Sequence, residues 1–170
     1  MSAAIGSYVR FMDRLADWIG SFAKYLIYVM IGVLLFDVIS DKGFGTVQNW
    51  TVETAQFTLA AFYFLAGPQT LKDDRHVRLD LVYARLSERG KAWIDMVTVS
   101  IVVFYLSVML WGALSSLQYS WNTNQRLPSL WAPSLVPIKV LMVVCLVLML
   151  MQCVAIFFKD VARVRGKAIA

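Results

Sequence analysis

Histidine and cysteine are scarce in this chain, which has one histidine, His76, and two cysteines among its 170 residues. A haem or zinc site built from several histidines cannot form within a single chain that carries only His76. Cys145 and Cys153 share one apolar run. At a helical rise of about 1.5 Å per residue they lie about 12 Å apart, too far for a disulfide bond. We expect buried, unreactive thiols and no cofactor.

Signatures of enzymatic chemistry are also lacking. Asp73, Asp74 and Asp80 surround His76 in the sequence, but we interpret this group as hydrated polar residues that close a turn. The chain has no G-x-x-x-x-G-K-[ST] phosphate loop, so it does not hydrolyse ATP by that route. Its serines are scattered, and no general base lies at a matching depth. The sequence therefore predicts a protein that is not an enzyme.

Charge is sparse in four long apolar stretches, and these define the class of protein. Hydrophobic residues make up 59% of the chain and its mean hydropathy is +0.65, both above the values of an ordinary soluble domain. A helix that spans a bilayer needs about 20 mostly apolar residues. The stretches cover residues 18–39, 52–71, 93–117 and 135–158. We predict an all-α integral membrane protein in which residues 1–170 form a single four-helix domain.

The basic residues alternate between the gaps, which indicates an orientation. Lys42 is the only basic residue of the first gap and Arg126 the only one of the third. The second gap and the two ends hold all the other basic residues outside the stretches: Arg10, Arg14, Lys72, Arg75, Arg78, Arg85, Arg89, Lys91, Lys159, Arg163, Arg165 and Lys167. Because basic residues favour the cytoplasmic side, both termini are predicted to be cytoplasmic. The net charge of +5 follows from this topology and from attraction to anionic lipid, without nucleic-acid binding.

The first twenty residues have helical periodicity and no signal-peptide pattern. One face would be apolar, with Ile5, Tyr8, Val9, Met12, Leu15, Ala16 and Ile19. The opposite face would carry Ser7, Arg10, Asp13, Arg14 and Asp17. Two interpretations are equally good: an amphipathic helix on the inner membrane face, or a cytoplasmic extension of the first span.

The middle loop has a similar pattern. Leu79, Val82, Tyr83, Leu86 and Trp93 would share one helical face, with most of the charges on the other. This pattern predicts a short interfacial helix whose basic face meets lipid headgroups. A partner protein is the alternative occupant of that face.

Five charged residues fall within the predicted spans: Lys24, Asp37, Glu53, Asp95 and Lys139. Each lies near the end of a span, where it can reach the interface or cap a helix. None lies at mid-membrane, which argues against an ion relay within this chain. Lys24 and Asp95 are expected at a similar depth near the inner face, where they are candidates for an ion pair.

Two segments around the second stretch resemble a known family. Trp50 and Glu53 open that stretch, and the run His76-Val77-Arg78-Leu79-Asp80 follows it. Both features, and the four-span pattern, are similar to the small membrane (Q-type) subunit of tripartite ATP-independent periplasmic (TRAP) transporters. Leu127-Pro128 and Val136-Pro137 are further similarities. Ile138-Lys139 departs from the small residue that is usual in the family at that point.

The resemblance implies a function that the residues alone do not show. In that family a periplasmic binding protein captures an organic anion, such as a dicarboxylate, sialic acid or keto acid. A large membrane subunit carries the anion inward by sodium symport, and the small subunit packs beside it. The predicted structural or partner-interface residues are Trp50, Glu53, His76, Asp80, Arg78, Lys24, Asp95, Asp37 and Lys139. On a helix His76 and Asp80 would share a face, and a hydrogen bond between them would fix the turn.

Two other classes stay open at this point. One is a haem-binding or electron-transfer membrane subunit, which would need paired axial ligands in the spans and would be revealed by an absorption spectrum. The other is a small self-sufficient transporter, which would need a polar residue deep in a span and would transport alone in liposomes.

Overall fold

Four helices make up the regular structure of the part of the chain that the computed structural model describes, residues 3–73 and 88–164. They are α1 (Ala3–Phe44), α2 (Thr51–Lys72), α4 (Glu88–Asn122) and α5 (Val136–Val164). An isolated antiparallel bridge joins Arg126 to Ser134 in the connection between α4 and α5. The chain is therefore all-helical over these residues, as predicted.

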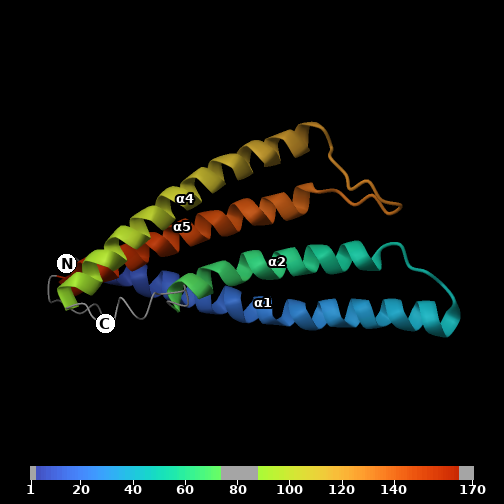
Figure 1. Cartoon of the computed structure of the whole chain (residues 1–170), viewed down its shortest axis with the longest axis horizontal. Coiled ribbons are helices and arrows are strands. Elements are labelled where there is room, and N and C mark those ends of the chain that lie inside the picture. The colour runs from blue at the N-terminus through green and yellow to red at the C-terminus, as the bar shows by residue number, and fades with distance from the viewer. Residues whose placement is uncertain (1–2, 74–87, 165–170) are drawn as a thin grey trace.

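The helices form two antiparallel hairpins, α1 with α2 and α4 with α5, and α5 packs against each of the other three helices (Figure 1). At one end of the bundle α1 begins and α5 ends; we call this the terminal end. The connections 45–50 and 123–135 lie at the opposite end, which we call the loop end. The two hairpins approach each other near the terminal end and diverge toward the loop end (Figure 1).

Within residues 3–73 and 88–164, three helical segments are long and apolar enough to cross a membrane: Gly6–Phe44, Val97–Asn122 and Val136–Lys159. Helix α2 begins and ends within one residue of the predicted 52–71 stretch. Its threonines and glutamines, with Gly67 and Pro68, make it less apolar than the other three. Three of the four predicted spans are thus long and apolar enough to cross a membrane. Helix α2 is long enough, but its composition is not apolar enough.

Helix α1 is one unbroken helix of 42 residues, about 63 Å long at about 1.5 Å per residue. That is about twice the thickness of a hydrocarbon core, and the helix does not break where the first span was predicted to begin. Of the two interpretations of the N-terminal segment, the continuous helix agrees with the extended first span. The predicted interfacial helix of the middle loop falls largely on residues 74–87, which lie outside the described residues, and Trp93 belongs to α4.

The apolar face of the first turns of α1 packs against protein, which does not support the surface helix, one of the two interpretations of this segment. Val9 and Met12 are 2% and 1% exposed and form a cluster with Ala155 of α5. Tyr8, Leu15 and Phe158 cover the rim of this cluster. The periodicity correctly indicated a helix with one apolar face, and this face packs against α5.

A second apolar cluster joins α2, α4 and α5 through Leu71, Leu106, Ala113, Leu146 and Cys153. Both cysteines are free and buried, as predicted. Since lipid is as apolar as these side chains, close packing contributes more to helix association here than removal from water.

Small residues allow the helices to approach each other at two points. A Cβ at Gly20 of α1 would lie 2.8 Å from the Cβ of Gln69 in α2. A Cβ at Gly67 of α2 would lie 2.7 Å from the Sδ of Met149 in α5. Both distances are shorter than a real contact allows, so a larger residue would force the neighbouring side chain to move, and least easily at Gly20, where the neighbour is a Cβ.

Candidate functional site

The polar side chains of the described residues gather at the two ends of the bundle. At the terminal end, Asp13 of α1 accepts hydrogen bonds from Lys159 Nζ at 2.9 Å and 2.8 Å, one to each carboxylate oxygen. Gln152 Nε2 of α5 donates to the same carboxylate at 3.1 Å, and Gln152 is 0% exposed. These three residues fasten α1 to the last turns of α5, and we call them the Asp13 cluster.

Two further contacts hold the same part of α1. Asp17, one helical turn after Asp13, forms a salt bridge with Lys72, the last residue of α2. The Tyr8 hydroxyl donates to the Met151 carbonyl oxygen of α5 at 2.9 Å. The start of α1 is therefore bound to α2 through Asp17 and to α5 through Asp13 and Tyr8.

The location of these pairs follows from the helical repeat. Asp13 and Asp17 are four residues apart, so they lie on one face of α1, beside the buried face that contains Met12 and Ala16. Lys72 and Lys159 are found where the apolar stretches of α2 and α5 end. Lysines near the C-terminal ends of α2 and α5 thus meet acidic residues on α1, the helix that passes both of them.

At the loop end, Lys139 joins α5 to the end of α4. Its Nζ donates to the Ser120 hydroxyl, to Gln125 Oε1 at 3.0 Å, and to the Ser116 carbonyl oxygen at 3.4 Å. Ser120 is 0% exposed and itself donates to Gln125 Oε1 at 2.6 Å. The ammonium therefore lies at the C-terminal end of α4, where the helix dipole favours a cation.

Replacing Lys139 by methionine is expected to loosen the α4–α5 hairpin at the loop end. Hydrogen bonds from a charged group contribute more than neutral ones, so we expect a loss of about 1–2 kcal/mol in the free energy of unfolding in detergent. Faster amide hydrogen exchange between residues 120 and 126 should accompany it. The control is Lys42→Met, since Lys42 is exposed and pairs with its neighbour Asp41, and we expect a change below about 0.5 kcal/mol. Equal effects of the two substitutions would contradict the capping role of Lys139.

The α1–α2 connection is held by a third polar group. The Thr51 hydroxyl donates to the Asp37 carboxylate and lies 3.0 Å from the Gln48 carbonyl oxygen. Trp50 precedes α2 at its N-cap position, and its indole Nε1 donates to Gln48 Oε1 at 3.3 Å. Since Thr51 is 0% exposed, this group fixes how α2 begins.

Glu53 and Trp50 lie in the same corner of the bundle. Glu53 is in the first turn of α2, where the helix dipole favours an anion. Its Oε2 is buried and has no hydrogen-bond partner among the described residues. The ring of Trp50 lies 5.9 Å from that of Phe36 in α1.

The predicted site residues are thus divided between several places. The structure brings Trp50, Glu53 and Asp37 into one corner and puts Lys139 at the end of the other hairpin. Lys24 is exposed on α1, and the side chain of Asp95 in α4 is not among those described, so their ion pair stays a prediction. His76, Arg78 and Asp80 lie outside the described residues.

The Asp13 cluster and the Asp17–Lys72 pair were not predicted from the sequence. Asp13 and Asp17 were assigned to the polar face of an amphipathic helix and so to water. The signal that points to them is their spacing of one turn, combined with lysines that close α2 and α5 at the same predicted depth. Gln152 was hidden within an apolar run, and nothing in the local sequence indicates its partner.

The middle of the bundle carries no formal charge. The segments 25–36, 54–71, 96–122 and 140–158 contain no Asp, Glu, Lys, Arg or His. Among the described residues no group of three or more His, Cys, Asp or Glu is placed to hold a metal ion. The fold and its polar groups define an integral membrane helical bundle whose polar side chains connect its own helices.

Comparison with known proteins gives the family. A family model described as tripartite ATP-independent periplasmic transporters, DctQ component, matches residues 30–163, which is most of the chain. The chain belongs to this family, as its resemblance to the small membrane subunit predicted. It is therefore a component of a transporter and not an enzyme. A search of curated proteins and a search of solved structures each returned no significant match.

Proposed function

We propose that this small TRAP transporter subunit braces the large membrane subunit during sodium-coupled uptake of organic carboxylate anions delivered by a periplasmic binding protein. Membership of the family supports a complex with those two partners. The bracing role, the sodium coupling and the class of substrate are our inference. The substrates implied are dicarboxylates, sialic acids or keto acids.

The distribution of polar groups is the observation that carries the bracing role. Polar contacts between the helices lie at both ends of the bundle, while its middle lacks charged residues. Substrate pathways in secondary transporters are usually formed by broken helices with polar groups near the bilayer midplane. Helix α1 runs unbroken for 42 residues, and in α2 the single internal proline, Pro68, is near the end. A bundle fastened at both ends supports a static role.

Helix α2 is proposed as the fourth span. Its 22 residues extend about 33 Å at about 1.5 Å per residue, which is sufficient for a hydrocarbon core of about 30 Å. It packs along α1, which is long and apolar enough to cross the membrane. Thr51 meets Asp37 near the loop end and Lys72 meets Asp17 near the terminal end. Helices that run side by side between these two contacts would cross the same layer.

The distribution of basic residues supports an orientation in the membrane. We propose that the terminal end is cytoplasmic and the loop end periplasmic, in a bacterial inner membrane. Single cysteines at Thr46 and Asn124, both exposed at the loop end, should react with a membrane-impermeant reagent in intact spheroplasts. Cysteines at Ser87 and Ala168 should not react until the membrane is opened. The native cysteines are buried, so the background should be low, and labelling of Ser87 from outside would refute this orientation.

The motif around His76 is proposed to contact the large subunit or to orient a basic segment against anionic lipid. With an affinity tag on this chain, the yield of co-purified large subunit measures assembly. Asp80→Ala should lower that yield severalfold, whereas His76→Gln should keep most of it because glutamine still donates a hydrogen bond. Wild-type assembly and transport in Asp80→Ala would exclude a structural role for the motif.

A further inference from the structure

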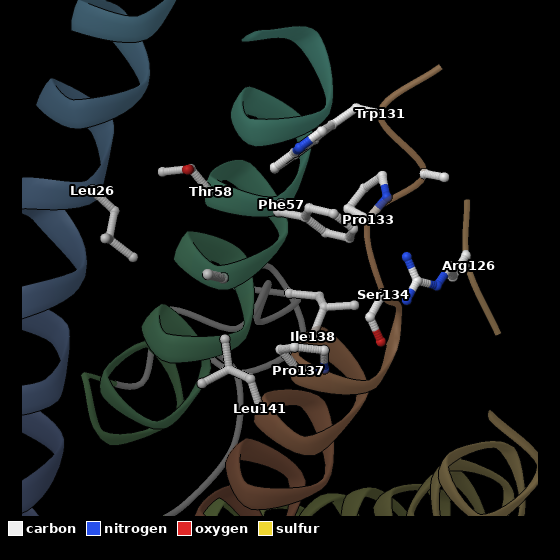
Figure 2. A pocket seen from close by; sticks show the side chains of 12 residues that line it. Leu26, Phe57, Thr58, Arg126, Trp131, Pro133, Ser134, Pro137, Ile138 and Leu141 are labelled. Atoms are coloured by element: carbon white, nitrogen blue, oxygen red, sulfur yellow. The ribbon is translucent and has the colours of Figure 1, made fainter. Parts of the chain in front are cut away.

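The divergence of the two hairpins leaves a groove of about 620 Å³ on the bundle. Leu26 of α1 with Phe57 and Ala61 of α2 form one wall, and Pro137, Ile138 and Leu141 of α5 form the other (Figure 2). The volume is in the range of small-molecule sites. Its mouth is formed by the 123–135 connection, which contributes Arg126 and Trp131. The groove therefore has an apolar floor and a cationic, aromatic rim.

The groove reaches about halfway through the membrane. Thr51 and Asp37 are hydrogen-bonded and mark one level near the loop end. Ala61 lies about 15 Å along α2 from this level, and Leu26 lies about 16 Å along α1, at about 1.5 Å per residue. Half of a hydrocarbon core is about 15 Å. The groove therefore has the depth of the acyl chains of one leaflet.

Polar donors at the rim lack partners within the described chain. Neither the Arg126 guanidinium nor the indole N–H of Trp131 has a hydrogen bond or an ion pair there. Figure 2 shows the guanidinium of Arg126 turned toward Pro133 and Ser134, and the Trp131 ring pointing from the connection toward α2. A guanidinium at a membrane interface favours a phosphate, which it binds through two parallel hydrogen bonds. An anion is thus expected at the mouth of an apolar groove.

We propose that this groove binds one glycerophospholipid from the leaflet at the loop end. One acyl chain lies between Phe57 and Leu141, and the phosphate accepts hydrogen bonds from Arg126. A phospholipid supplies an apolar chain and an anion in one molecule, which matches both parts of the site. An apolar helix of a partner would fill the walls but would leave the charge of Arg126 without a counter-ion. The bound lipid acts as a filler that joins the two hairpins where their own side chains do not meet.

Native mass spectrometry tests this proposal on the full-length chain, in the complex in which it purifies from the membrane in a mild detergent. The wild type should retain one phospholipid per chain that Arg126→Gln loses, with binding weakened roughly tenfold because a charged hydrogen bond is removed. Ala61→Phe, which fills the groove, should lose the same lipid. The control is Lys42→Gln, which removes an exposed loop-end cation that pairs with Asp41 and does not line the groove.

Adding defined lipids separates the phosphate contact from simple apolar filling. After delipidation, phosphatidylethanolamine or phosphatidylglycerol should rebind to the wild type, and diacylglycerol, which has no phosphate, should rebind at least several-fold more weakly. Equal lipid retention in all variants, or equal rebinding of diacylglycerol, would overturn the proposal. So would loss of the large subunit from Ala61→Phe with unchanged lipid content, because the groove would then be a protein interface. Arg126 is exposed, so Arg126→Gln should fold normally. This variant therefore still tests the proposal if Ala61→Phe does not fold.

Discussion

Replacing Asp13 by asparagine should detach the first turns of α1 from α5. The substitution removes the charge that Lys159 meets at 2.8 Å and 2.9 Å and weakens the hydrogen bond from the fully buried Gln152. A buried charge left without its partner costs about 3–5 kcal/mol, and an exposed pair contributes about 1 kcal/mol or less. The side chains of Asp13 and Lys159 are 23% and 33% exposed, which places this pair between those cases. We expect a loss of about 2 kcal/mol, roughly a thirtyfold change in the unfolding equilibrium.

Unfolding of the purified protein in mixed detergent micelles, followed by circular dichroism, measures this loss. Asp13→Lys should be worse than Asp13→Asn, because it brings two cations together. The double variant Asp13→Lys with Lys159→Asp should regain much of the stability, because the two charges of the pair are then exchanged. Asp41→Asn is the matched control, because Asp41 pairs with the exposed Lys42 next to it and should change little. Additive effects of Asp13→Asn and Lys159→Met in a double-mutant cycle would show that the two residues do not interact.

Both bounds of α2 and the beginning of α5 could be predicted from the sequence because clear signals mark them, whereas α5 continues to Val164, beyond the predicted end at residue 158. Trp50 precedes α2 and Lys72 closes it, while Pro137 lies in the first turn of α5. Proline is tolerated there because the first N–H groups of a helix have no partner within the helix. The beginning of α1 was harder, since Asp13 and Asp17 interrupt the apolar pattern and suggested a boundary. Their charges are compensated by lysines of other helices, so the helix continues.

The partners of the polar residues could not be predicted from one sequence. Lys139 was expected to reach the interface or to cap a helix, but the helix that it caps is α4, and its acceptors come from residues 116–125. Asp37 was placed correctly near the end of a span, yet its hydrogen bond to Thr51 depends on how α1 and α2 turn. Hydropathy gives the depth of a residue, whereas a contact also needs the rotation of each helix. That rotation is set by packing, for example at Gly20 and Gly67.

A further prediction concerns transport by the isolated chain. Reconstituted alone in liposomes with a sodium gradient, this chain should show no uptake of organic anions above that of empty liposomes. The physical reason is the absence of charged residues from the middle of all four helices: a carboxylate crossing the bilayer core needs polar partners there. Sodium-driven uptake by the isolated chain would refute the bracing role. When this chain is added to the large subunit and the substrate-loaded binding protein, sodium-driven uptake should appear.

The most direct test of the central claim is a comparison of proteoliposomes that contain the large membrane subunit and the substrate-loaded binding protein, with and without this chain. With the chain present, sodium-driven uptake should be robust, and Asp13→Lys should reduce it because the brace is loosened at the terminal end. Without the chain, uptake should fall to the level of empty liposomes although the large subunit is present in the same amount. Full uptake in the absence of this chain would contradict the account.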